Sequence, residues 1–122
     1  MAAETLAAEG LEVTVVNCRF LKPMDEAVLS RVLGEHNRIL TVEEGAVVNG
    51  FGASLACAVR DREDAEDTRI RALGIPDDFV AHGGRAELLR EIDLDAQGIV
   101  ETMRSLLATD LASAPSPVRE SA

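Results

Sequence analysis

The residues best suited to chemistry in this 122-residue chain lie between Thr41 and Arg60, in the stretch TVEEGAVVNGFGASLACAVR. Within it, Gly50–Gly52 follows a predicted strand and begins a predicted helix, the context in which glycine-rich loops bind the phosphates of dinucleotides. Two carboxylates, Glu43 and Glu44, precede the loop. Carboxylates that are brought together can serve as a general acid and a general base. The stretch is therefore a candidate for a phosphate site and for an acid–base pair.

Spacing and charge both argue against the phosphate site. The dinucleotide pattern places its third glycine at position 55, where Leu55 stands. Glu43 and Glu44 would also repel a bound phosphate, by about 1 kcal/mol at 4 Å in water and by several times more when partly buried. We therefore expect an acid or a partner group, rather than a phosphate, to satisfy the unpaired amides at the start of this helix.

The other candidate residues do not form a site on their spacing either. Glu43 and Glu44 are adjacent, so on a strand they point to opposite faces, and a structural role at the strand end is predicted for them. His36 and His82 each lack a second ligand at metal-binding spacing, so no metal site is predicted. His82 with Arg85 could bind an anion at a helix start, although anchoring of the loop is the favoured interpretation.

Composition restricts the function further. Twelve basic against twenty-two acidic residues give a net charge of −10, which disfavours binding to nucleic acid or to an anionic membrane surface. Cys18 and Cys57 are far apart and flanked by apolar residues, so we expect two buried thiols in a reducing compartment. Neither a signal peptide nor an apolar run of about 18 residues is found, which predicts a soluble, cytoplasmic protein.

Helical and strand-like patterns alternate along the chain and predict an α/β fold with a mainly parallel sheet. We expect Phe51–Val59, which has no polar face, to be buried on all sides, and the charged run Asp61–Asp67 to be a solvated turn. Residues 1–109 are predicted to form the domain and residues 110–122 a disordered tail. The predicted helices are Ala2–Glu9, a segment from Pro23 to Gly34, Phe51–Val59, Arg85–Glu91 and a last helix capped by Asp95, and the predicted strands are Leu11–Phe20, Arg38–Val42 and Ile70–Ile75.

Four blocks occur in order along the chain: AAETLAAEGLEVTVVNCRFLKPMD, TVEEGAVVNGFGASL, ALGIPDDFVAHGGRAELL and DLDAQGI. In these blocks the chain resembles the C-terminal domain of transketolase-like thiamine diphosphate enzymes, and the third block is most similar to the 1-deoxy-D-xylulose-5-phosphate synthase family. Asn49 and Asp93 stand where relatives often have glycine, and both residue types tolerate a left-handed backbone. The motif residues singled out as structural are Glu43, Glu44, Gly50, Gly52, Pro76, His82, Gly83 and Arg85.

The resemblance implies a three-layer fold, with helices on both faces of the sheet, that lacks the family's first strand. In the family this strand precedes the first helix, so we expect a segment before residue 1 to be missing. Such a strand would lie between the strands at Val13 and Ile39, which would otherwise lose their shared neighbour. Dimerisation or domain swapping is one predicted way of completing the sheet.

The resemblance also implies a function. The parent enzyme would condense pyruvate with glyceraldehyde 3-phosphate and release carbon dioxide, for the synthesis of isoprenoids and thiamine. Its other domains would bind thiamine diphosphate and Mg²⁺, so no catalytic, cofactor-binding or metal-binding residue is assigned here and the chain alone is expected to be inactive. Its partners would be the remaining domains and a second subunit. The alternatives are a stand-alone module that binds a small anion, at Gly50–Ala53 or His82–Arg85, and a module that docks a partner subunit.

Overall fold

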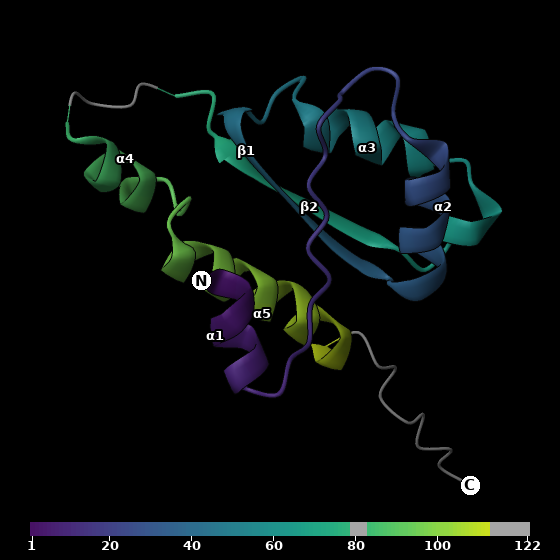
Figure 1. Cartoon of the computed structure of the whole chain (residues 1–122), viewed down its shortest axis with the longest axis horizontal. Helices are drawn as coiled ribbons and strands as arrows, with labels where there is room; N and C mark the ends of the chain where they lie inside the picture. The colour runs from purple at the N-terminus through teal and green to yellow at the C-terminus, as the bar shows by residue number, and fades with distance from the viewer. Residues whose placement is uncertain (79–82, 113–122) are drawn as a thin grey trace, which may run out of the picture.

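The computed structural model describes residues 1–78 and 83–112, and the side chains of its last helix as far as residue 108. Figure 1 shows a short sheet with helices around it. The elements in chain order are α1 (Ala2–Ala8), α2 (Glu26–Glu35), β1 (Arg38–Ala46), α3 (Phe51–Val59), the 3₁₀-helix η1 (Glu63–Ala65), β2 (Arg69–Ile75), α4 (Arg85–Glu91) and α5 (Ala96–Ala112).

The sheet of the described residues consists of β1 and β2, which run parallel. Arg38 lies opposite Arg69, and the register continues regularly as far as Val42 opposite Leu73. Helices α3 and α5 both contact the two strands, and they approach the sheet from different sides (Figure 1). Burial on both faces is typical of parallel sheets. The predicted α/β fold is therefore confirmed, in a form that has a two-stranded parallel sheet.

The core is aliphatic, as a composition with three Phe and no Tyr or Trp predicts. Leu29 and Leu33 of α2 pack with Leu55 and Val59 of α3 and with Ala65 of η1. Another buried region lies where α1 contacts α5. Its most buried side chains are Leu6, Val100 and Leu106.

Several local signals act as the sequence predicts. Gly10 follows the first helix with φ of 82°, which is the left-handed conformation that ends many helices. Asp95 caps α5, because its carboxylate accepts a hydrogen bond from the Gly98 amide at 2.8 Å. Asn49 and Asp93, which were expected to tolerate a left-handed backbone, have φ of 61° and 57°. Both residues thus have the left-handed conformation that glycine adopts most readily.

The predicted strand Leu11–Phe20 is not a strand in the structure. No residue of this segment pairs with β1 or β2, and Figure 1 draws it as a coil between α1 and α2. Val15 and Phe20 expose 76% and 73% of their surface. Strand-forming residues need a neighbouring backbone before they can form a ladder. The assignment of a strand to this segment is therefore wrong.

Two expectations about burial are also wrong. Cys18 and Cys57 are both exposed. In α3 the side chains of Leu55 and Val59 are buried, but Ala56, Cys57 and Ala58 face outward, so small apolar residues there form an exposed surface. The acids of the charged run Asp61–Asp67 are exposed, as expected for a solvated turn, although the run contains η1, whose Ala65 belongs to the core. Residue type alone does not distinguish a small apolar residue that is covered from one that is exposed.

The start of the predicted tail, at residues 110–112, is helical in the structure. Helix α5 continues through Ala112, three residues beyond the predicted end of the domain. The rest of the predicted tail lies outside the described residues. His82 also lies outside them.

Candidate functional site

The glycine corner, which we define as residues Glu43–Gly52, joins the end of β1 to the start of α3. Its central contact is the half-buried Glu43 carboxylate. One oxygen of this carboxylate accepts a hydrogen bond from the Phe51 amide at 2.8 Å, and the other accepts from the Gly52 amide at 3.1 Å. A carboxylate at this position also interacts favourably with the dipole of the helix. Glu43 therefore occupies the place that a phosphate would take, and the expectation of an internal acid is confirmed.

The two glycines of the corner are needed for close approach. A Cβ at Gly50 would come within 2.4 Å of the Ala46 carbonyl oxygen and within 2.6 Å of both Glu43 carboxylate oxygens. At Gly52 it would lie 2.5 Å from the Thr41 hydroxyl and 2.5 Å from the Ala72 Cβ. Real Cβ atoms do not approach other atoms so closely, so any side chain would push α3 away from the sheet. The glycines pack the helix on the strands and also leave room for the carboxylate.

Thr41 is the buried polar residue beneath this contact. Its side chain is 5% exposed, and its hydroxyl has no hydrogen-bond partner among the described residues. The hydroxyl faces Gly52, where close packing leaves no space for a bound group. Although a buried unpaired hydroxyl can indicate a ligand site, this one lies against the helix itself.

Glu44 points to a different element from Glu43. Its carboxylate accepts a hydrogen bond from the Arg85 guanidinium at the start of α4, and both side chains are mostly exposed. The Gly84 amide, just before that helix, donates to the Glu87 carboxylate at 3.3 Å. The two adjacent glutamates thus bind two different helices. This arrangement agrees with their predicted structural role and does not form an acid–base pair.

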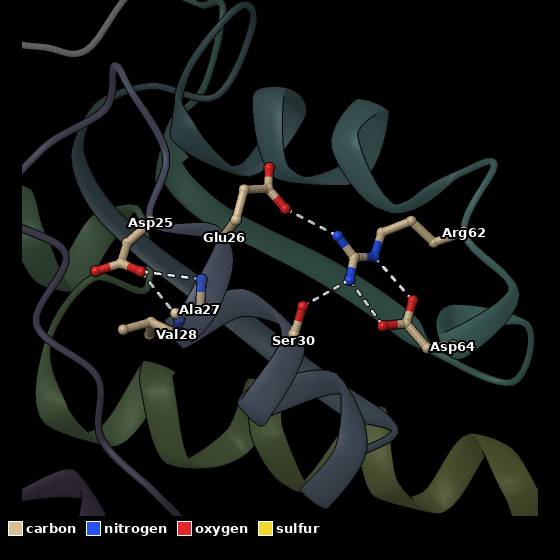
Figure 2. A network of polar contacts seen from close by, with 7 residues as sticks. All are labelled: Asp25, Glu26, Ala27, Val28, Ser30, Arg62 and Asp64. Atoms are coloured by element: carbon tan, nitrogen blue, oxygen red, sulfur yellow. Dashed lines mark hydrogen bonds and ion pairs between the residues drawn. The ribbon is translucent and has the colours of Figure 1, made fainter.

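A second polar network joins α2 to η1 and centres on Arg62 (Figure 2). The guanidinium donates to both carboxylate oxygens of Asp64, at 2.8 and 2.7 Å, and to Glu26 and the Ser30 hydroxyl, each at 2.9 Å. The hydrogen bonds with Asp64 raise the pKa of Arg62 and lower the pKa of Asp64. Figure 2 also shows Asp25 capping α2 through the amides of the two residues after Glu26. The Arg62 guanidinium therefore links the start of η1 to the side chains of Glu26 and Ser30 on α2.

A third ion pair joins α1 to α5. Arg104 donates two hydrogen bonds to the Glu9 carboxylate. The hydrogen bonds lower the pKa of Glu9 and raise the pKa of Arg104. This pair strengthens the contact between the two helices and leaves no unpaired charge for a ligand.

The remaining predicted motif residues lie in connecting loops. Pro76 directly follows β2 and is exposed, and so is Gly83, which precedes α4. The ring nitrogen Nε2 of His36 lies 3.9 Å from the Glu35 carboxylate and 3.0 Å from the Thr14 hydroxyl, and among the described residues His36 belongs to no group of three or more potential metal ligands. Sequence reasoning missed this contact, and the 22 residues that separate its partners give no local signal for it.

The described residues do not fit the cofactors that the resemblance implies. They contain no group of three or more His, Cys, Asp or Glu side chains that could hold a metal ion. The amides of the glycine corner, which could have bound a diphosphate, are hydrogen-bonded to Glu43. Within the same residues no helix is long and apolar enough to cross a membrane.

Comparison with known proteins identifies the family to which the domain belongs. The family described as "Transketolase, C-terminal domain" matches residues 1–99. The chain belongs to this family. In sequence it is 43% identical over 106 residues to the 1-deoxy-D-xylulose-5-phosphate synthase of Geobacillus thermodenitrificans, covering 87% of this chain. It is 42% identical over 114 residues to the synthase of the same name from Gloeobacter violaceus, covering 93% of this chain.

A solved structure shares the fold. The protein described as "Split gene transketolase, inactive beta4 tetramer" superposes with a TM-score of 0.78 and 27% sequence identity, over 88% of this chain and 34% of its own. The chain spans 17% and 18% of the lengths of the two synthases. The similarity therefore concerns one domain of a much larger enzyme.

Proposed function

We propose that this chain is the non-catalytic C-terminal packing and interface domain of a 1-deoxy-D-xylulose-5-phosphate synthase. The observation that carries the proposal is the identity of about 40% with synthases over most of this chain, which corresponds to only 17% of the Geobacillus enzyme. The reaction of the parent enzyme would be condensation of pyruvate with glyceraldehyde 3-phosphate and loss of carbon dioxide. Its partners would be the remaining domains and a second subunit, in the cytoplasm.

The chemistry of the described residues supports a role without catalysis. Glu43 hydrogen-bonds the amides of the glycine corner, and Glu44 pairs with Arg85. Each carboxylate of the corner therefore has a structural partner. Thiamine diphosphate and Mg²⁺ would be bound by the remaining domains of the synthase.

The alternative of a stand-alone module that binds a small anion is less well supported. At Gly50–Ala53 the first amides of α3 bind Glu43, which an anion would have to displace. At His82–Arg85 the Arg85 guanidinium already binds Glu44. An anion there remains a prediction, because His82 lies outside the described residues.

The test uses the Geobacillus thermodenitrificans synthase without the segment that this chain matches. The purified chain is mixed with this truncated synthase, and complex formation is measured by analytical ultracentrifugation. We expect a complex, and we expect calorimetry to detect thiamine diphosphate and Mg²⁺ binding to the truncated synthase and not to the chain alone. The intact synthase is the control and should not bind the chain, because its own domain occupies the position. Cofactor binding by the isolated chain, or no complex with the truncated synthase, would overturn the proposal.

A further inference from the structure

We propose that Asn49 and Gly50 form a site of spontaneous chemical modification, at which the Asn49 side chain loses ammonia and the backbone rearranges to isoaspartate. The change would need only water, and it would release helix α3 from its Glu43 cap. The inference concerns the chain itself and does not depend on the proposed function.

The pair Asn49–Gly50 combines an amide side chain with the least hindered kind of backbone nitrogen. Because glycine has no Cβ, another group can approach its nitrogen closely. The chain contains two other asparagines, Asn17 and Asn37, which are followed by cysteine and by arginine. The side chains of those two neighbours hinder such an approach. Asn49 is therefore the asparagine at which attack by the next backbone nitrogen is easiest.

The structure leaves both groups of the pair accessible and weakly held. Asn49 is exposed, and no hydrogen bond to its side chain is found in the part of the chain that the structure describes. The Gly50 amide donates to the Val47 carbonyl at 3.3 Å, which is long for a hydrogen bond of this type. The pair also lies between β1 and α3, outside both elements. Opening of this turn breaks one long hydrogen bond, and it frees the Gly50 nitrogen to reach the Asn49 side chain.

The reaction has two steps, and water is its only co-reactant. In the first step, the Gly50 nitrogen attacks the side-chain carbonyl carbon (Cγ) of Asn49 and forms a C–N bond. The bond from Cγ to the side-chain nitrogen breaks, and ammonia leaves with the proton that the Gly50 nitrogen has lost. In the second step, water opens the resulting cyclic imide at one of its two carbonyls. Opening at the backbone carbonyl leaves Gly50 joined to the former side chain, as isoaspartate, and opening at the other carbonyl gives aspartate.

Isoaspartate does not fit the glycine corner, because it adds one carbon atom to the backbone directly before Gly50. A single Cβ at Gly50 would already overlap the Ala46 carbonyl oxygen and the Glu43 carboxylate. A longer backbone must therefore move Gly50 relative to these groups. The Phe51 and Gly52 amides, which donate to Glu43, come next in the chain and would move with it. We therefore expect both amides to lose their cap.

The test follows the modification in the whole purified chain, kept at physiological temperature in mildly alkaline and in mildly acidic buffer. Peptide mapping by mass spectrometry measures the conversion of each asparagine, and an isoaspartyl methyltransferase detects the isoaspartate. We expect Asn49 to convert about tenfold faster than Asn17 and Asn37, because only its neighbour lacks a side chain. Conversion should be faster in the alkaline buffer, where more of the attacking nitrogen is deprotonated. Equal rates at the three asparagines, or aspartate without isoaspartate at Asn49, would overturn the inference.

Two variants separate the rearranged backbone from the added charge. Asn49→Gly lacks the side-chain amide and suits the φ of 61°, so its unfolding midpoint should be the same before and after incubation. Asn49→Asp, measured when freshly prepared, adds the charge without lengthening the backbone. The isoaspartate form of the parent chain, separated by chromatography, should exchange its Phe51 and Gly52 amides about tenfold faster than either variant, as loss of the cap requires. If fresh Asn49→Asp exchanges these amides as fast as the isoaspartate form, the rearranged backbone is not the cause and the inference is overturned.

Discussion

The glycine corner and the segment Leu11–Phe20 both carry clear sequence patterns, but only the corner forms the structure that its pattern predicts. In the corner, Glu43 binds the first amides of α3, and the glycines bring that helix onto the sheet. In the segment, the residues favour a strand, yet no ladder forms. Glu43 finds its hydrogen-bond partners eight and nine residues further along the chain. The segment, in contrast, pairs with neither strand of the sheet that the described residues form.

The comparison shows what each kind of pattern specifies. A cap is specified by a carboxylate and by the amides at the start of a nearby helix, so the sequence of a short stretch is sufficient. A strand is specified by its neighbours, because its stability arises from cross-strand pairs and burial. The corner therefore forms from residues close in the chain, whereas the segment pairs with no strand of the described residues and stays irregular.

The largest effect is expected from Gly52→Ala in the corner. The added methyl group would lie 2.5 Å from the Thr41 hydroxyl and from the Ala72 Cβ, so α3 must move. We expect a loss of about 2 kcal/mol or more in the free energy of unfolding, as for overpacked cores. Urea denaturation followed by circular dichroism measures it.

The control is the same substitution at Gly34, within α2. A Cβ there meets no atom within 4 Å, and alanine favours a helix over glycine. Gly34→Ala should therefore raise the free energy of unfolding, by about 0.5–1 kcal/mol. If Gly52→Ala were as stable as Gly34→Ala, close approach would not be the reason for the glycine.

A smaller effect is expected from Glu43→Ala. Removal of the carboxylate leaves the Phe51 and Gly52 amides without their partner, which costs about 1–3 kcal/mol for partly buried groups. Glu43→Gln, which keeps one acceptor, should lie between this variant and the parent chain. Denaturant titration of the three proteins under identical conditions measures the series.

Glu44→Ala is the matched control, since the two residues are adjacent but bind different helices. Glu44 and Arg85 are 61% and 72% exposed, and exposed ion pairs contribute about 0–1 kcal/mol. A cost equal to that of Glu43→Ala would show that the cap is not the dominant contact of the corner.

Sequence patterns predicted the elements that depend on near neighbours. The bounds of α3 and α4, the cap at Asp95 and the left-handed residues Asn49 and Asp93 all follow from residues close in the chain. In the candidate site, the opposed roles of Glu43 and Glu44 follow from the alternation of a strand.

The features that the sequence did not predict depend on distant residues. The exposure of Cys57 depends on which elements cover α3, and small apolar residues suit both sides of a helix. Arg62 lies in a run of charges that reads as a solvated turn, but it binds Glu26 from 36 residues away. An arginine on the surface could pair with any of several exposed acids. The packing of α2 against η1 decides which acid lies close to Arg62, and the local sequence does not specify that packing.

The smallest effect is expected from Val15→Thr with Val16→Thr in the isolated chain. Both valines are exposed and their backbone makes no ladder, so the free energy of unfolding should change by less than about 0.5 kcal/mol. Urea denaturation should give the same midpoint and slope as for the parent chain. A loss comparable to that of Glu43→Ala would mean that the segment is packed in solution, and the contrast with the glycine corner would disappear. An unchanged midpoint would mean that the strand-forming residues of this segment contribute nothing to the stability of the isolated chain, as expected for β-branched residues that have no cross-strand neighbours.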